Sequence, residues 1–101
     1  MANDDRDIEL QRIAARLEVV EALLWASEHA QELLAIVSSS ATGPDVMKRL
    51  GQSPYSFTEF QAHHILDIPL RRLTQQNVAL LRGEVERLRR GDGSTPTSWQ
   101  P

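Results

Sequence analysis

Apolar residues in the first part of the chain recur at alternating steps of three and four. This spacing is typical of one face of a helix and not of a strand. There is no Gly or Pro between Met1 and Thr42, and Ala, Leu, Glu, Arg and Gln favour helix there. We therefore predict a helix over residues 4–38. In its second part, either the apolar face becomes wider than a narrow seam or the helix breaks near His29. The seam positions are Ile13, Leu17, Val20 and Leu24.

The middle of the chain is divided by Gly and Pro into short segments. A short helix is predicted over Pro44–Leu50, because Pro is well accommodated in the first helical turn. Thr58 and Gln61 have the spacing of a capping box, which predicts a helix start at that point. Pro69 removes a backbone donor, so we expect this helix to kink or stop near Asp67.

A last helix is predicted over Gln75–Arg90, with Thr74 as its N-cap. Its apolar positions form a second seam, which can pair antiparallel with the first. The expected fold is all-α, a long antiparallel helical hairpin (coiled coil) with a small helical cluster at its tip. Residues 1–9 form a partly flexible lead-in, 10–90 the folded domain and 91–101 a flexible tail. The second seam consists of Val78, Leu81, Val85 and Leu88.

The charge distribution agrees with two elements that attract each other. Residues 1–45 hold nine acidic residues and three arginines, a net charge of −6, whereas residues 46–101 hold eight basic and five acidic residues, a net charge of +3. The overall net charge of −3 gives no support for non-specific binding to nucleic acid.

Composition narrows the functional classes further. A chain of 101 residues holds one small domain, for which a second copy or another partner is a reasonable expectation. The absence of Cys excludes disulfides, thiolate metal sites and a cysteine nucleophile. No apolar run approaches the roughly 20 residues of a membrane helix, and an acidic segment follows Met1, so we expect no secretory signal, no membrane partner and a cytoplasmic location.

Three features are candidates for chemistry. His63 and His64 are adjacent in a predicted helix, so their rings point about 100° apart and do not converge on a metal ion. Tyr55 has no acid–base partner nearby in the sequence, which favours a packing role. The serines at 38–40 lack a glycine-rich phosphate pattern and are interpreted as a polar linker. We expect no catalytic residue, no metal, no cofactor and no small-molecule ligand.

The basic second half allows two interpretations. Arginines on a helix face can contact phosphates, which leaves DNA contact open. However, Glu84 and Glu86 interleave with the arginines and no aromatic residues accompany them for base stacking. A solvated face that complements the acidic first helix is the favoured interpretation. The arginines concerned are Arg71, Arg72, Arg82, Arg87, Arg89 and Arg90.

Two motifs carry a resemblance to a known family. The segment 61–74 resembles the Q-A-x-x-I-L-D-x-x-L-x-x-L-T pattern of the A subunit of bacterial type IIA topoisomerases, DNA gyrase and topoisomerase IV. The segment 16–23 is similar to that family's R-x-x-[IV]-[IVL]-E-G-L, with Ala22 in the Gly place. Residues 35–40 lie where the family has an L-I-R-x-S segment. The resemblance covers about residues 12–90.

The resemblance implies a position within that family's architecture. The corresponding segment is the lower end of a coiled coil together with the helical domain at its tip, the exit gate through which transported DNA leaves. The tip is the family's primary dimer interface, so a homodimer is expected. Pro69 and His64 depart from the family pattern, as does the segment 74–77, which indicates a divergent stand-alone paralogue. The expected dimer contacts are Phe57, Phe60, Gln61, His64, Ile65 and Ile68.

The functional prediction is a non-catalytic homodimerisation module that modulates or associates with the A subunit of a type II topoisomerase. It is not predicted to be an enzyme, because the family's catalytic tyrosine region has no counterpart and Tyr55 does not match its setting. One alternative is a piece of a split topoisomerase whose cleavage domain is on another chain. The other is a coiled-coil adaptor unrelated to DNA.

Overall fold

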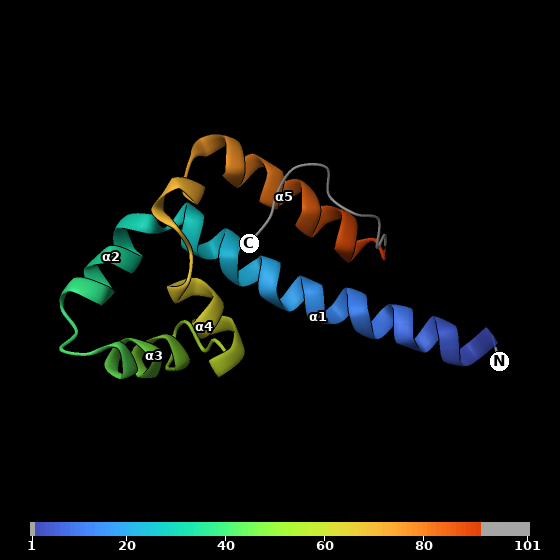
Figure 1. The fold of residues 1–101 in the computed structure, drawn as a ribbon, viewed down its shortest axis with the longest axis horizontal. Helices are drawn as coiled ribbons and strands as arrows, with labels where there is room; N and C mark the ends of the chain where they lie inside the picture. The colour runs from blue at the N-terminus through green and yellow to red at the C-terminus, as the bar shows by residue number, and fades with distance from the viewer. Residues whose placement is uncertain (1, 92–101) are drawn as a thin grey trace.

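The computed structural model describes residues 2–91, with side chains from Asp5 onward, and within this part of the chain every regular element is a helix (Figure 1). The predicted tail at 92–101 lies outside the described residues. Within them, no helix is long and apolar enough to cross a membrane. The elements are α1 (Ala2–Glu28), α2 (Ala30–Ser38), α3 (Gly43–Gly51), α4 (Glu59–Leu66), a 3-10 turn η1 (Leu70–Arg72) and α5 (Gln75–Arg89).

The first helical stretch breaks at His29, which is one of the two outcomes expected from the sequence. His29 has φ −123° and ψ 39°, outside the helical region. Its ring Nδ1 lies 2.9 Å from the Trp25 carbonyl, and its ring stacks on the Trp25 indole. The break turns α2 away from the α1 axis, so the chain leaves the long arm and enters the helical tip (Figure 1).

Helix α5 returns antiparallel along α1, which forms the predicted hairpin (Figure 1). Buried apolar residues between the two helices form what we call the arm core. Five of the predicted seam residues belong to it, whereas Leu17 and Leu24 pack partly buried against it and Val78 is half-buried. The arm core consists of Ile13, Val19, Val20, Leu23, Leu81, Val85 and Leu88.

A second core, the tip core, lies where α2, α3 and α4 meet the second half of α1. An aromatic group flanks it, because Tyr55 and Phe57 both approach the Trp25 ring edge-on with centroids 5.2 Å apart. The helical tip therefore has apolar packing of its own. The tip core consists of Ala22, Ala26, Leu33, Ile36, Val46, Leu50, Ala62 and Ile65.

Local capping sets the helix boundaries, and the caps at Thr58 and Thr74 are those that the sequence predicts. The hydroxyls of Thr42, Thr58 and Thr74 each accept a hydrogen bond from the backbone N–H three residues on. Gln61 completes the capping box by accepting from the Thr58 N–H at 3.0 Å. Helix α4 ends at Leu66, three residues before Pro69, so the predicted stop is confirmed.

Helix α1 extends past the end of α5, and the apolar side chain of Leu10 is consequently 51% exposed. Leu88, near the end of α5, belongs to the same buried cluster as Ile13. Figure 1 shows the N-terminal part of α1 projecting beyond the end of α5. Helices α1 and α5 therefore pack against each other only from about Ile13 to the tip.

We predict that Leu50→Ala lowers the free energy of unfolding by about 2–5 kcal/mol, because Leu50 is completely buried in the tip core. Urea denaturation followed by circular dichroism measures the change. The matched control is Ile8→Ala on the projecting end of α1, where the side chain is 48% exposed and the change is expected within about 0.5 kcal/mol. Equal destabilisation by both variants would contradict the assignment of the tip core.

Candidate functional site

A partly buried ion pair joins the two arms in the middle of the hairpin. Arg16 on α1 donates from Nε to Glu84 Oε1 at 2.7 Å and from Nη2 to Glu84 Oε2 at 3.4 Å. The Glu84 side chain is 3% exposed and that of Arg16 34% exposed. Charged hydrogen bonds in such a sheltered place are directional, so this pair fixes the register of α5 on α1.

The sequence interpretation of Glu84 as part of a solvated face is wrong. Glu84 lies on the same helical face as Leu81, Val85 and Leu88, three or four residues from two of them. This spacing indicates that Glu84 is buried, but the charge of its side chain favoured an exposed position. Arg16, the arginine of the topoisomerase-like motif, compensates the buried carboxylate.

Two further ion pairs link the arms at their surface. Arg89 pairs with Glu21 at 3.1 Å, and Arg82 pairs with Glu28 at 2.5 Å. The predicted attraction between the acidic first helix and the basic second half is confirmed by these contacts. Exposed pairs of this kind add little stability, and their contribution falls as salt increases.

The tip is joined to the arm by the first turn of α4. Gln61 Nε2 donates to the Glu18 backbone carbonyl at 2.8 Å, and Thr58 Oγ1 donates to a Glu18 carboxylate oxygen at 3.0 Å. The two residues of the capping box therefore also hold α4 against α1. Gln61 was expected at the dimer interface, and its side chain makes these contacts within one chain.

The other expected interface residues differ in what they can offer a partner. Ile65 is 2% exposed inside the tip core, and Phe57 and Ile68 are half-buried. Phe60 is 54% exposed, and its ring meets the half-buried His64 ring with centroids 4.7 Å apart. Phe60 is thus the expected contact with the most free apolar surface, and its place in an interface stays a prediction.

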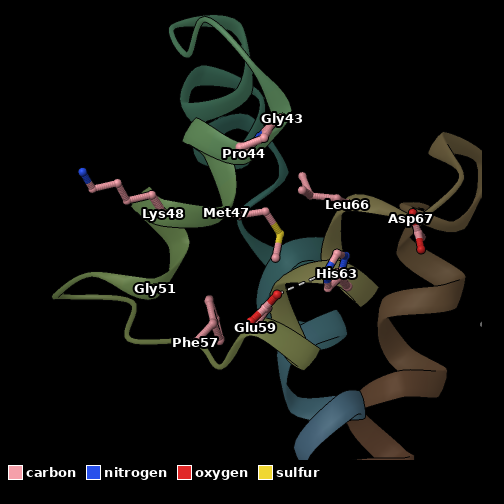
Figure 2. A pocket seen from close by; sticks show the side chains of 10 residues that line it. All are labelled: Gly43, Pro44, Met47, Lys48, Gly51, Phe57, Glu59, His63, Leu66 and Asp67. Carbon is pink, nitrogen blue, oxygen red and sulfur yellow. Dashed lines mark ion pairs between the residues drawn. The ribbon is translucent and has the colours of Figure 1, made fainter.

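An open groove of about 650 Å³ lies between α3 and α4 (Figure 2). Met47, Phe57 and Leu66 supply its apolar part, and charged groups also line it. Among these, the exposed His63 lies 3.8 Å from Glu59. The other charged residues lining the groove are Lys48 and Asp67.

The described residues place no catalytic group in an activated setting. Within residues 2–91 no three His, Asp or Glu side chains gather in a way that could hold a metal ion. Tyr55 lies in the segment between α3 and α4, and its hydrogen bond with Glu32 raises the pKa of the phenol. A raised pKa disfavours the phenolate, which is the opposite of what a tyrosine nucleophile requires.

The two sequence motifs lie within this helical hairpin and its packed helical tip. The family model for the A subunit of DNA gyrase/topoisomerase IV matches residues 1–92. The chain belongs to this family. The match includes both arms and the whole tip, and it confirms the resemblance that the two motifs indicated.

Individual relatives agree with the family match. The topoisomerase 4 A subunit of Bacillus subtilis is 36% identical over 80 residues, 79% of this chain and 10% of the relative. The DNA gyrase A subunit of Lawsonia intracellularis is 38% identical over 66 residues, 65% of this chain and 8% of the relative. The topoisomerase 4 A subunit of Streptococcus pneumoniae is 34% identical over 79 residues, 78% of this chain and 10% of the relative. The chain thus spans about a tenth of the length of the relatives it matches.

We predict that Glu84→Ala lowers the free energy of unfolding by about 1–3 kcal/mol, because it removes a buried, hydrogen-bonded partner of Arg16. Glu86→Ala, two residues away on the exposed face of α5, is the control and is expected to change it by less than about 0.5 kcal/mol. Thermal or urea denaturation measures both. A Glu84 variant as stable as the Glu86 variant would show that the pair does not secure the hairpin.

Proposed function

We propose that the chain is a non-catalytic homodimerisation module of the exit-gate type, which self-associates through its helical tip. The observation that carries the proposal is the coincidence of the family match with a tip that has its own packed core. The matched region, although a tenth of its relatives' length, contains a hairpin and a tip held together by two separate apolar cores.

Exposed apolar side chains on the tip support self-association. Leu34 and Val37 of α2 are 52% and 39% exposed, Phe60 of α4 is 54% exposed, and Leu70 of η1 is 74% exposed. Large apolar side chains left open to water are a common property of contact surfaces. In a symmetric dimer the same patch serves both protomers, so one set of such residues is enough for a two-fold contact.

The same surface is proposed to pair with the tip of a full-length topoisomerase of this family. Two-fold interfaces accept a homologous partner when the contact residues are compatible, and the relatives are 30–38% identical over the matched segment. A mixed dimer would contain one short chain and one full-length protein. In this role the short chain modulates a type II topoisomerase without taking part in its chemistry.

A second candidate function is favoured by the limited coverage of the relatives. The chain would then be one piece of a split type IIA topoisomerase, with the cleavage domain on another chain. Recovery of DNA relaxation after mixing this chain with such a partner would support this candidate. An adaptor unrelated to DNA is disfavoured by the family membership.

We predict that the wild-type chain behaves as a dimer with twice the 11.4 kDa chain mass in light scattering, and that Phe60→Asp shifts it toward monomer. Phe60 is exposed in the first turn of α4, where an acidic residue also suits the helix dipole, so the fold should persist. Ile65→Asp would instead disrupt the tip core and test folding alone.

The matched control is Leu10→Asp, which places the same charge on an equally exposed apolar position of the projecting arm. It should remain dimeric if contact is made through the tip. Dissociation by Leu10→Asp with no effect of Phe60→Asp would move the interface to the arms. A folded wild-type monomer at high concentration would refute the dimer.

We predict that incubation at micromolar concentration with the full-length A subunit of a topoisomerase IV produces mixed dimers containing the wild-type chain. Co-purification through a tag on the short chain measures the exchange, and Phe60→Asp serves as the interface-deficient control. If wild-type homodimers persist and no mixed species forms, the modulator role is wrong while the homodimer stands.

A further inference from the structure

A second, smaller pocket lies where η1 leads into α5, away from the groove between α3 and α4. Its volume is about 230 Å³, and no Asp or Glu belongs to its lining. The lining residues are Arg71, Arg72, Thr74, Gln76, Asn77 and Leu80. Two adjacent arginines, a hydroxyl and two side-chain amides thus surround a space without a carboxylate.

The two arginines of this pocket differ from the three arginines that form ion pairs across the hairpin. Arg16, Arg82 and Arg89 each form an ion pair with a glutamate across the hairpin. Among the described residues, neither Arg71 nor Arg72 has a carboxylate oxygen within 4.0 Å. Complementarity to the acidic first helix therefore explains Arg82 and Arg89 and does not extend to this pair.

Arg72 also has an unsatisfied donor. Its Nε atom is shielded from solvent and has no hydrogen-bond partner in the described part of the chain. Buried polar groups in folded proteins are nearly always hydrogen-bonded, and a guanidinium N–H left without a partner is costly. The Arg72 guanidinium at this pocket is therefore incompletely compensated by the described residues.

The surrounding backbone suits the same kind of ligand. The N–H groups of Gln75 and Gln76 lie in the first turn of α5, where no intrahelical acceptor exists, and that turn contains no acidic residue. Asn77 donates from Nδ2 to the Arg72 carbonyl at 2.7 Å, which holds η1 against the start of α5. The backbone N–H groups at the start of α5 are therefore held in place relative to η1 before any ligand arrives.

We propose that this pocket binds a phosphate group, carried either by the backbone of duplex DNA or by a free phosphate ion. The planar guanidinium groups of Arg71 and Arg72 match tetrahedral oxyanions through paired N–H donors. The hydroxyl of Thr74 accepts from the Asn77 N–H, so its own proton is available to donate to the ligand. Phe60 is not among the residues that line this pocket.

The test uses the full chain and two probes. Fluorescence anisotropy with a labelled 20-base-pair duplex measures DNA binding at several salt concentrations, and amide chemical shifts during titration with inorganic phosphate locate the free ion. Arg71→Gln removes an exposed charge and is expected to weaken binding of the responding probe by roughly tenfold. For DNA, the slope of log affinity against log salt should also fall by about one.

Arg90→Gln is the matched control, because it removes an equally exposed arginine at the other end of α5. It should weaken binding less than about twofold. Arg72→Lys keeps the charge but loses the paired donors, and its helical content by circular dichroism distinguishes a binding defect from unfolding.

Each outcome decides the proposal. Changes in the amide chemical shifts of Gln75 and Gln76 on addition of phosphate would support binding of the free ion. Duplex binding that depends on Arg71 and not on Arg90 would support binding of the DNA backbone. Equal losses in both variants would mean diffuse electrostatic attraction and would overturn the site. The absence of any response to either probe would overturn it as well.

Discussion

Helix α1 belongs to both hydrophobic cores, and the other elements take their positions from it. Val20 and Leu23 face the arm core and α5, whereas Ala22 and Ala26 face the tip core, and all four are almost completely buried. Small side chains at the last two positions let the tip helices approach the α1 backbone closely. A methyl group at Ala22, where the family motif has Gly, is evidently compatible with this approach.

The charged groups add orientation to this apolar packing. Burial of Glu84 is tolerated only because Arg16 approaches it with paired donors, and a shift of α5 along α1 would separate them. The surface pairs have the opposite polarity, because Glu21 and Glu28 lie on α1 and their arginine partners lie on α5. The acidic α1 and basic α5 therefore have one electrostatically preferred alignment, and the proposed dimer would use surfaces that these pairs leave free.

Local features of the fold could be predicted from the sequence, and contacts between distant segments could not. Helix caps act on the residues next to them, as Thr58 and Thr74 do, and so does the stop before Pro69. Such effects can therefore be predicted from the sequence. The burial of Ile65 and Glu84 depends on which helix covers which face. Helix α4 has apolar residues on several sides, and only its docking on α1 decides that Ile65 lies inside and Phe60 outside.

The double use of Gln61 ties the integrity of α4 to its attachment. Its side-chain oxygen accepts from the Thr58 N–H, while its nitrogen donates to the Glu18 carbonyl on α1. Unwinding of the first turn of α4 therefore also breaks this hydrogen bond to α1, and loss of the hydrogen bond to α1 leaves the Gln61 side chain less well held in the capping box. Capping of α4 and its attachment to α1 are thus coupled through one side chain, in addition to the apolar packing of the tip core.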